Sequence, residues 1–175
     1  MADVRGAVDA MSNLDFVDSS KILVAGYALG ATVGLYAAAL DERIAGLVSV
    51  SGFTPMRTDS KDNGREGIKA FSHLHGLIPR LGFFVGNEDR IPYDYQEILG
   101  SIAPRPVLLI APQLDQTANL RDIRASVSEA EKIYKLLGAP DQLVLNTPDD
   151  FNRFSDEMKE IIYDWSRKLM KPVSN

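Results

Sequence analysis

The stretch KILVAGYALGATVGLYAAAL, residues 21–40, decides the fold, because it changes from one type of secondary structure to another at its centre. Its first six residues, KILVAG, are a short apolar run with β-branched side chains, which predicts a buried strand. Residues 30–40 are rich in small side chains and predict a helix that packs closely on a sheet. Gly26 and Gly30 flank the junction. We therefore expect a sharp strand-to-helix turn centred on Ala28.

The rest of the chain continues this alternation of strand and helix. Further apolar runs predict three more strands, at residues 44–53, 105–112 and 142–148. Helical spacing predicts helices at residues 3–14, 93–102, 122–138 and 155–170, the third of them ended by Gly138. We expect all four strands to be buried. Strands that alternate with helices form a parallel sheet wound by right-handed crossovers, so the sequence predicts an α/β fold with a mainly parallel sheet of about four strands and flanking helices.

One long segment interrupts this alternation. Residues 54–103 carry Gly, Pro and charged side chains in their first half and the helix at 93–102 in their second. Long inserts in a compact domain often cover a functional site. We expect a single domain over residues 1–175 with a lid-like insert at about 54–103.

Composition excludes several classes of function. The chain has 175 residues, of which 45% are hydrophobic, enough for one sizeable core. Its 19 basic and 24 acidic residues give a net charge of −5 and are scattered, so neither nucleic acid nor a membrane is expected as a partner. The chain has no cysteine and only two histidines, which leaves little to bind a metal, and we expect no cofactor. The first sixteen residues carry acidic side chains and no long apolar run, which favours a cytoplasmic location.

The turn at GYALG, residues 26–30, has three interpretations. It fits the nucleophile elbow G-x-S-x-G, in which small flanking residues let a strand turn sharply into a helix and raise the central side chain above the sheet. Ala28 then stands in the place of the serine. It is also compatible with an ordinary strand-to-helix turn whose glycines serve packing. A nucleotide-binding loop is the third interpretation, but the G-x-G-x-x-G spacing and the P-loop lysine are both absent.

Two long stretches resemble the C-terminal half of an α/β-hydrolase, in the dienelactone hydrolase and acetylxylan-esterase-like region of that superfamily. Residues 3–53 resemble its helix, nucleophile strand, elbow, next helix and next strand, and residues 93–119 resemble the segment that leads to the triad acid. The resemblance implies a truncated α/β-hydrolase core related to carboxylic ester hydrolases of the esterase or lipase type. It also implies a small ester-like molecule as the ligand.

The resemblance assigns roles to individual residues. Ala28 takes the nucleophile position, and Leu29 supplies the backbone amide of an oxyanion hole. Asp115 matches the triad acid, although a solvated or helix-capping aspartate is the alternative. Asn152 matches the histidine position, with Asn146 as a second candidate. A methyl group cannot attack a carbonyl and an amide cannot cycle a proton near neutral pH, so the chain is expected to be inactive as an esterase.

Six further residues are expected to bind the substrate: Tyr27, Phe53, Thr54, Arg57, His73 and His75. One of the two histidines could replace the missing base above the elbow, or both could be polar members of a loop cluster with Phe83 and Phe84. Arg57 could bind an anionic group at the carboxyl edge of the sheet, or it could pair with an acidic neighbour.

Three classes of function remain open. The chain could be an inactive hydrolase scaffold, a binding or regulatory module that uses the old pocket, or a fragment or assembly subunit. In the superfamily the nucleophile strand is central, whereas here only a helix precedes it. One edge of residues 21–26 should therefore be bare, and an apolar strand with unpaired backbone groups favours pairing with another chain. We expect a homo-oligomer joined through or near residues 21–26, or a piece of a longer protein.

Overall fold

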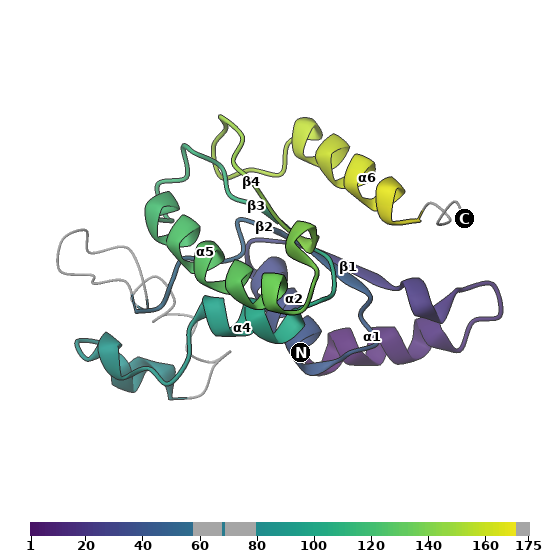
Figure 1. Ribbon diagram of the computed structural model, residues 1–175, viewed down its shortest axis with the longest axis horizontal. Helices are drawn as coiled ribbons and strands as arrows, with labels where there is room; N and C mark the ends of the chain where they lie inside the picture. Colours follow the sequence, from purple (N-terminus) through teal and green to yellow (C-terminus); the bar gives the residue numbers. More distant parts are fainter. Residues whose placement is uncertain (58–67, 69–79, 171–175) are drawn as a thin grey trace.

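The computed structural model describes residues 1–57, 68 and 80–170 and shows a parallel sheet between layers of helices (Figure 1). Along the chain its elements are α1 (Ala2–Ser12), η1 (Ser19–Lys21), β1 (Leu23–Tyr27), α2 (Leu29–Leu40), β2 (Gly46–Val50), η3 (Leu81–Phe84), η4 (Glu88–Arg90), α4 (Tyr95–Ile102), β3 (Val107–Ile110), α5 (Leu120–Leu136), η5 (Pro140–Gln142), β4 (Leu143–Asn146) and α6 (Asp156–Met170). No helix in these ranges is both long and apolar enough to cross a bilayer.

The four strands lie in the order β1-β2-β3-β4, and every neighbouring pair is parallel. The predicted fold class is therefore confirmed. The strands are shorter than the apolar runs that predicted them. β2 ends at Val50 because the next residue, Ser51, has a φ of 48°, which no strand residue adopts. Pro112, two residues after the end of β3, has no N–H with which to continue a ladder.

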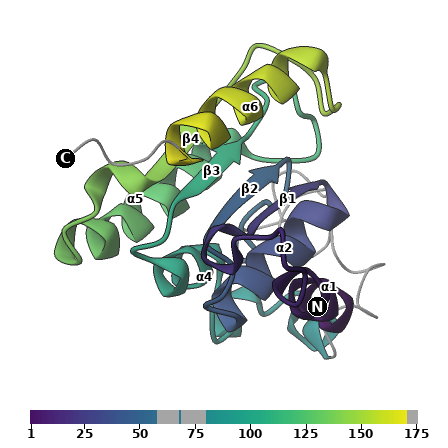
Figure 2. The ribbon, with the colours of Figure 1, turned by 90° about the vertical axis from the view of Figure 1, so that its right-hand side faces the viewer.

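Helices cover the two faces of the sheet unequally (Figure 2). On the first face, α2, α4 and α5 form the main core against residues such as Leu47 and Leu109. On the second face α6 is the one helix of the described chain that packs, and its one fully buried residue is Met158. Its other apolar residues against the sheet, Ile161, Ile162 and Trp165, stay half-exposed.

This unequal cover corrects the expectation that all four strands are buried. Every residue of β2 and β3 is buried, but Ala25 and Tyr27 of β1 and Val144 of β4 are exposed. The two inner strands have neighbours on both sides and helices on both faces. The outer strands have one neighbour each in the described chain, and the buried strand residues under α6 belong to β2 and β3.

β1 lies at an edge of the sheet, as the sequence predicted, since it pairs only with β2 among the described residues. Two of its backbone hydrogen bonds toward β2 are accepted by the Ile22 carbonyl, from the Ala45 amide, and donated by the Ala28 amide, to the Val50 carbonyl. Bonding alternates from residue to residue along a parallel ladder, so Leu23, Ala25 and Tyr27 turn their N–H and C=O groups toward the open edge.

Candidate functional site

The turn between β1 and α2 has the geometry of a nucleophile elbow. Ala28 has φ 49° and ψ −118°, a left-handed conformation that costs a residue with a side chain about 1–3 kcal/mol. Its N–H donates to the Val50 carbonyl at 2.9 Å, and its own carbonyl accepts the first helical bond, from the Thr32 amide at 3.0 Å. The turn thus places residue 28 at the carboxyl end of β1 with its side chain clear of the ladder. That side chain is a methyl group, which offers no nucleophile.

The two glycines that flank the elbow have different roles. A Cβ on Gly26 would lie 2.4 Å from the backbone carbon of Gly30 and 2.5 Å from the Ala31 nitrogen, whereas a Cβ on Gly30 would meet nothing within 4 Å. Only Gly26 is therefore required for the close approach of helix to strand.

Leu29, the expected oxyanion donor, is the first residue of α2. The first amides of a helix have no acceptor within the helix, so its N–H is available to a ligand oxygen. Its side chain is exposed beside the elbow. Its role as a donor of an oxyanion hole stays a prediction.

Asp115 and Asn152, the residues expected at the positions of the triad acid and histidine, are joined through a third residue. The Thr117 hydroxyl donates to Asp115 Oδ1 at 2.7 Å, and the Thr117 amide donates to the same oxygen at 2.8 Å. Asn152 Nδ2 donates to Thr117 Oγ1 at 3.4 Å. Tyr27 is the last member of this hydrogen-bond network, because its hydroxyl lies 2.9 Å from Asn152 Oδ1 and 3.1 Å from the Asn152 carbonyl oxygen. The network crosses the carboxyl ends of β1, β3 and β4.

Sequence reasoning missed Thr117. The spacing D-x-T, in which a threonine two residues after an aspartate closes a local side-chain turn, was the signal available for it. Asn146, the second candidate for the histidine position, lies at the end of β4 opposite Ile110, where its carbonyl accepts from the Ala111 amide at 2.9 Å. The structure thus connects Asn152, through Thr117, to Asp115.

A buried carboxylate holds the loop that carries Asn152. Burial alone would raise the pKa of Asp150, but hydrogen bonds from the Phe151 amide and the Arg153 side chain hold its pKa below the ordinary value. The Asp150 carbonyl also accepts from the Leu114 amide at 3.0 Å. The loops after β3 and β4 are therefore tied together just before the network begins.

Phe53 and Thr54 follow β2 but point into the core. Phe53 stacks on Tyr95 with ring centroids 4.3 Å apart, and both residues are almost fully buried. The Thr54 hydroxyl accepts from the Asn119 amide at 3.5 Å. A role for either residue in substrate binding stays a prediction.

Arg57 has the geometry of the paired alternative. Its Nε donates to the Ile91 carbonyl at 3.0 Å, and its Nη1 lies 3.4 Å from Glu97 Oε1. His73 and His75 lie outside the described residues, so their assignment as a replacement base stays a prediction.

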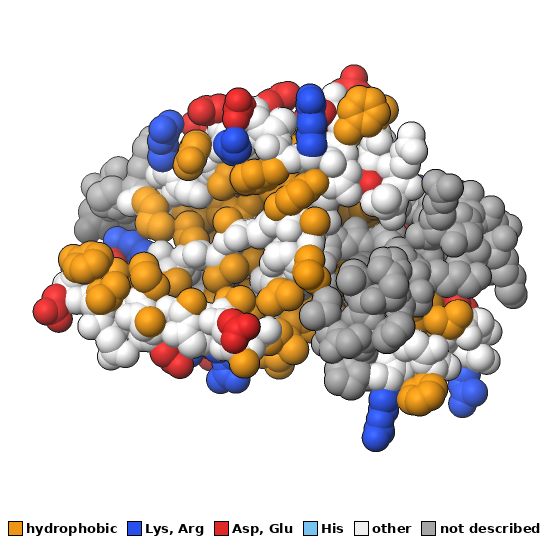
Figure 3. All heavy atoms as spheres, turned by 180° about the vertical axis from the view of Figure 1, so that it is seen from behind, with side chains coloured by type: hydrophobic (Ala, Val, Ile, Leu, Met, Phe, Trp, Pro, Cys, Tyr) orange, Lys and Arg blue, Asp and Glu red, His pale blue; other side chains and the backbone are white. Residues whose placement is uncertain are grey.

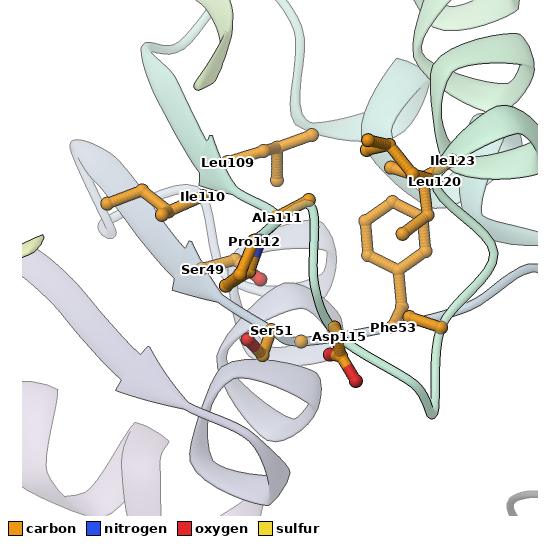
Figure 4. A pocket seen from close by; sticks show the side chains of 12 residues that line it. Ser49, Ser51, Phe53, Leu109, Ile110, Ala111, Pro112, Asp115, Leu120 and Ile123 are labelled. Atoms are coloured by element: carbon orange, nitrogen blue, oxygen red, sulfur yellow. The ribbon is translucent and has the colours of Figure 1, made fainter. Parts of the chain in front are cut away.

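A small cavity lies beneath the loop that carries Asp115 (Figure 4). Its volume is about 10 Å³, the size of one water molecule, and its lining includes Ser49, Ser51, Phe53 and Asp115. The hydroxyls of Ser49 and Ser51 are buried without a hydrogen-bond partner in the described part of the chain. A sugar or an acyl group does not fit this space.

The side chains of the described ranges gather no metal site: no group of three or more His, Asp or Glu residues there is placed to hold an ion.

Comparison with known protein sequences finds one matching family and a similar carbohydrate esterase. The sequence profile of the fungal glucuronyl esterase family matches residues 4–138. Carbohydrate esterase MZ0003, from an unknown prokaryotic organism, is 25% identical over 134 residues, which are 75% of this chain and 31% of that protein. The chain thus spans about a third of the length of that relative.

Solved structures share the fold. A glucuronoyl esterase from Solibacter usitatus superposes with a TM-score of 0.80 at 15% identity, covering 97% of this chain and 48% of that one. A CE15 glucuronoyl esterase from Caldicellulosiruptor kristjansonii superposes with a TM-score of 0.79 at 22% identity, covering 99% of this chain and 51% of that one. The chain spans about half the length of these proteins. Because the profile matches most of the chain and the fold is that of the α/β-hydrolase relatives, the chain belongs to the glucuronyl esterase family of carbohydrate esterases.

Proposed function

We propose that this chain is a glucuronyl esterase-like protein that binds a sugar ester without hydrolysing it. The observation that carries the proposal is Ala28, held in the strained conformation of a nucleophile elbow with a methyl group where the attacking atom would be. The protein keeps this strained backbone conformation, which costs free energy, although a methyl group cannot act as a nucleophile.

The expected loss of catalytic rate is large. In a serine hydrolase triad, loss of the serine or the histidine costs on the order of a million-fold in kcat. Here the nucleophile position holds alanine and the proposed histidine position holds Asn152. The amide of Asn152 already bonds to Tyr27 and Thr117 and cannot carry a proton from one group to another.

The retained features are those of binding. The Leu29 amide can donate to a carbonyl oxygen, and Asp115, Thr117, Asn152 and Tyr27 form a polar network beside it. The similar proteins are named glucuronoyl and carbohydrate esterases. An ester of a uronic acid sugar is therefore the ligand class that we propose.

We expect no burst and negligible turnover when the unmodified chain is incubated with methyl glucuronate, and Ala28→Ser is expected to remain inert because Asn152, at the expected histidine position, cannot activate the new hydroxyl. Ester hydrolysis is measured for both forms side by side, and binding of the same ester is measured by calorimetry. Ala28→Gly is the matched control, since it changes the same position and adds no hydroxyl.

Clear turnover by the unmodified chain would contradict the proposal that the protein does not hydrolyse the ester. Turnover by Ala28→Ser alone would show that a base exists after all. Failure of the ester to bind to the unmodified chain would overturn the binding function.

We also propose a second role, in assembly, which the exposure of β1 favours. Ala25 and Tyr27 leave the strand exposed on its second face, and Met158 is the one fully buried residue of the α6 helix that packs on that face. Seen from behind, hydrophobic side chains gather in a band below α6 (Figure 3). An edge strand with apolar neighbours and few charges is a template for pairing with another strand.

The assembly role predicts that the chain forms homodimers or larger species at micromolar concentration and that Ala25→Lys shifts them toward monomer. A lysine beside the open edge disfavours strand pairing. Light scattering over a dilution series measures both forms. A monomeric unmodified chain whose residues 21–26 are protected from hydrogen exchange would show that the edge is covered from within.

A further inference from the structure

We propose that Tyr27 and Phe154 form a stacking platform for the ring of a neutral pyranose sugar. The platform rests on the proposed binding function and adds to it a subsite and a sugar class. It lies next to the elbow, because Tyr27 is the last residue of β1 and precedes Ala28.

The two aromatic rings come from segments far apart in the sequence and meet at the surface. Their centroids are 5.8 Å apart and their planes are inclined by 31°. Tyr27 is 36% exposed and Phe154 is 45% exposed. The pair therefore offers adjoining aromatic surface to solvent at the carboxyl end of β1.

Both rings are held in place by polar partners. The Tyr27 hydroxyl is fixed by the side chain and the carbonyl of Asn152. Lys159 Nζ lies 5.7 Å from the centroid of the Phe154 ring, a cation–π geometry, and also pairs with Asp156. Rings that are fixed before binding lose little conformational entropy when a ligand lies on them.

The surroundings favour a sugar over a purely apolar ligand. A pyranose presents C–H groups on its faces, which pack on aromatic rings, and hydroxyls around its rim, which need hydrogen-bond partners. Asn152 and Thr117 lie at the edge of the platform and supply such partners. The one-water cavity under Asp115 is too small for this ring.

Charge pairing near the platform favours a neutral sugar over an anionic one. The cation nearest to Phe154, Lys159, is 2.7 Å from Asp156 Oδ1, and Arg153 Nε is 2.7 Å from Asp150 Oδ1. Each cation is thus balanced by a carboxylate. The platform would hold the neutral part of a glycan to which a uronoyl ester is attached.

The test is a titration of the full chain with xylobiose, a neutral disaccharide, followed by NMR. We expect ring protons of the sugar to shift upfield, since they lie over aromatic faces, and we expect Phe154→Ala and Tyr27→Ala to weaken binding about three- to tenfold, the range of one aromatic contact. Phe16→Ala is the matched control: it removes an equally large ring that is 84% exposed and belongs to the segment before β1. It should leave binding unchanged.

Two further variants separate stacking from folding. Phe154→Leu keeps apolar bulk but removes the aromatic face, so it should lose the upfield shifts while its thermal unfolding stays close to that of the unmodified chain. Tyr27→Phe keeps the face and removes the hydroxyl, so the upfield shifts should persist.

The outcomes distinguish this proposal from the proposed function. Ester turnover by the unmodified chain, with xylobiose binding that still depends on Phe154, would overturn the silent esterase and leave the platform standing. Xylobiose binding that is unaffected by Phe154→Ala and Tyr27→Ala, or no xylobiose binding at all, would overturn the platform, whether or not methyl glucuronate binds. Self-association that buries Phe154 in place of sugar binding would assign this surface to a second copy and would also overturn the platform.

Discussion

Gly26→Ala is expected to lower the free energy of unfolding by at least about 3–4 kcal/mol, a large part of the 5–15 kcal/mol typical of a domain. The new Cβ would lie 2.4 Å from the backbone of Gly30 and 2.5 Å from that of Ala31. These atoms belong to the first turn of α2, which cannot move away without breaking its packing on β1 and β2. The clash therefore acts on the whole strand-to-helix unit. Urea denaturation followed by circular dichroism measures the loss.

Gly30→Ala is the matched control for this prediction. It makes the same chemical change four residues later, where a Cβ meets nothing within 4 Å. Because alanine favours a helix over glycine, it is expected to raise the free energy of unfolding by about 0.5–1 kcal/mol. Equal effects of the two substitutions would show that the close packing of α2 on β1 is not what the elbow requires.

Asp94→Ala is expected to cost about 3–4 kcal/mol, because it leaves several backbone donors without their acceptor. Asp94 is 1% exposed, and its carboxylate accepts from the amides of Met56, Arg57 and Tyr95, each at 2.8 Å. It is the N-cap of α4, and its bonds to Met56 and Arg57 also hold the segment that follows β2. The substitution should therefore loosen residues 54–57 together with the helix. Thermal unfolding and hydrogen exchange of the Met56 amide measure the two effects.

Asp94→Asn and Asp89→Ala serve as controls for this loss. Asparagine keeps one acceptor oxygen and should recover part of the stability, whereas Asp89 is exposed and its substitution should change stability by less than about 0.5 kcal/mol. A loss for Asp94→Ala no larger than that for Asp89→Ala would contradict the role of the buried carboxylate.

Local sequence patterns were sufficient for the elements and their order. Apolar runs and helical spacing are set by residues close together in the chain, so the strand, turn and helix of residues 21–40 could be predicted, and with them the parallel sheet. The edge position of β1 in the described sheet agrees with the same order. Gly138 ended α5 as expected, with a φ of 72°.

The composition of the site could be predicted only in outline. Ala28 and Asp115 follow strands, and the ends of parallel strands meet at one edge, which brought them to the same region. Which side chains touch was decided by loops that meet in space. Thr117 connects Asp115 to Asn152, and Tyr27 reaches a residue 125 positions away.

The sequence by itself determined the α/β class and the strand-to-helix turn with alanine at its centre, because these depend on the identity and spacing of neighbouring residues. Only the tertiary structure decided that Gly26 is required and Gly30 is not, that Phe53 stacks in the core, and that β1 and β4 stay partly exposed. Burial and close contact depend on which distant segments pack against a residue. That packing is a property of the whole fold, which no local pattern contains.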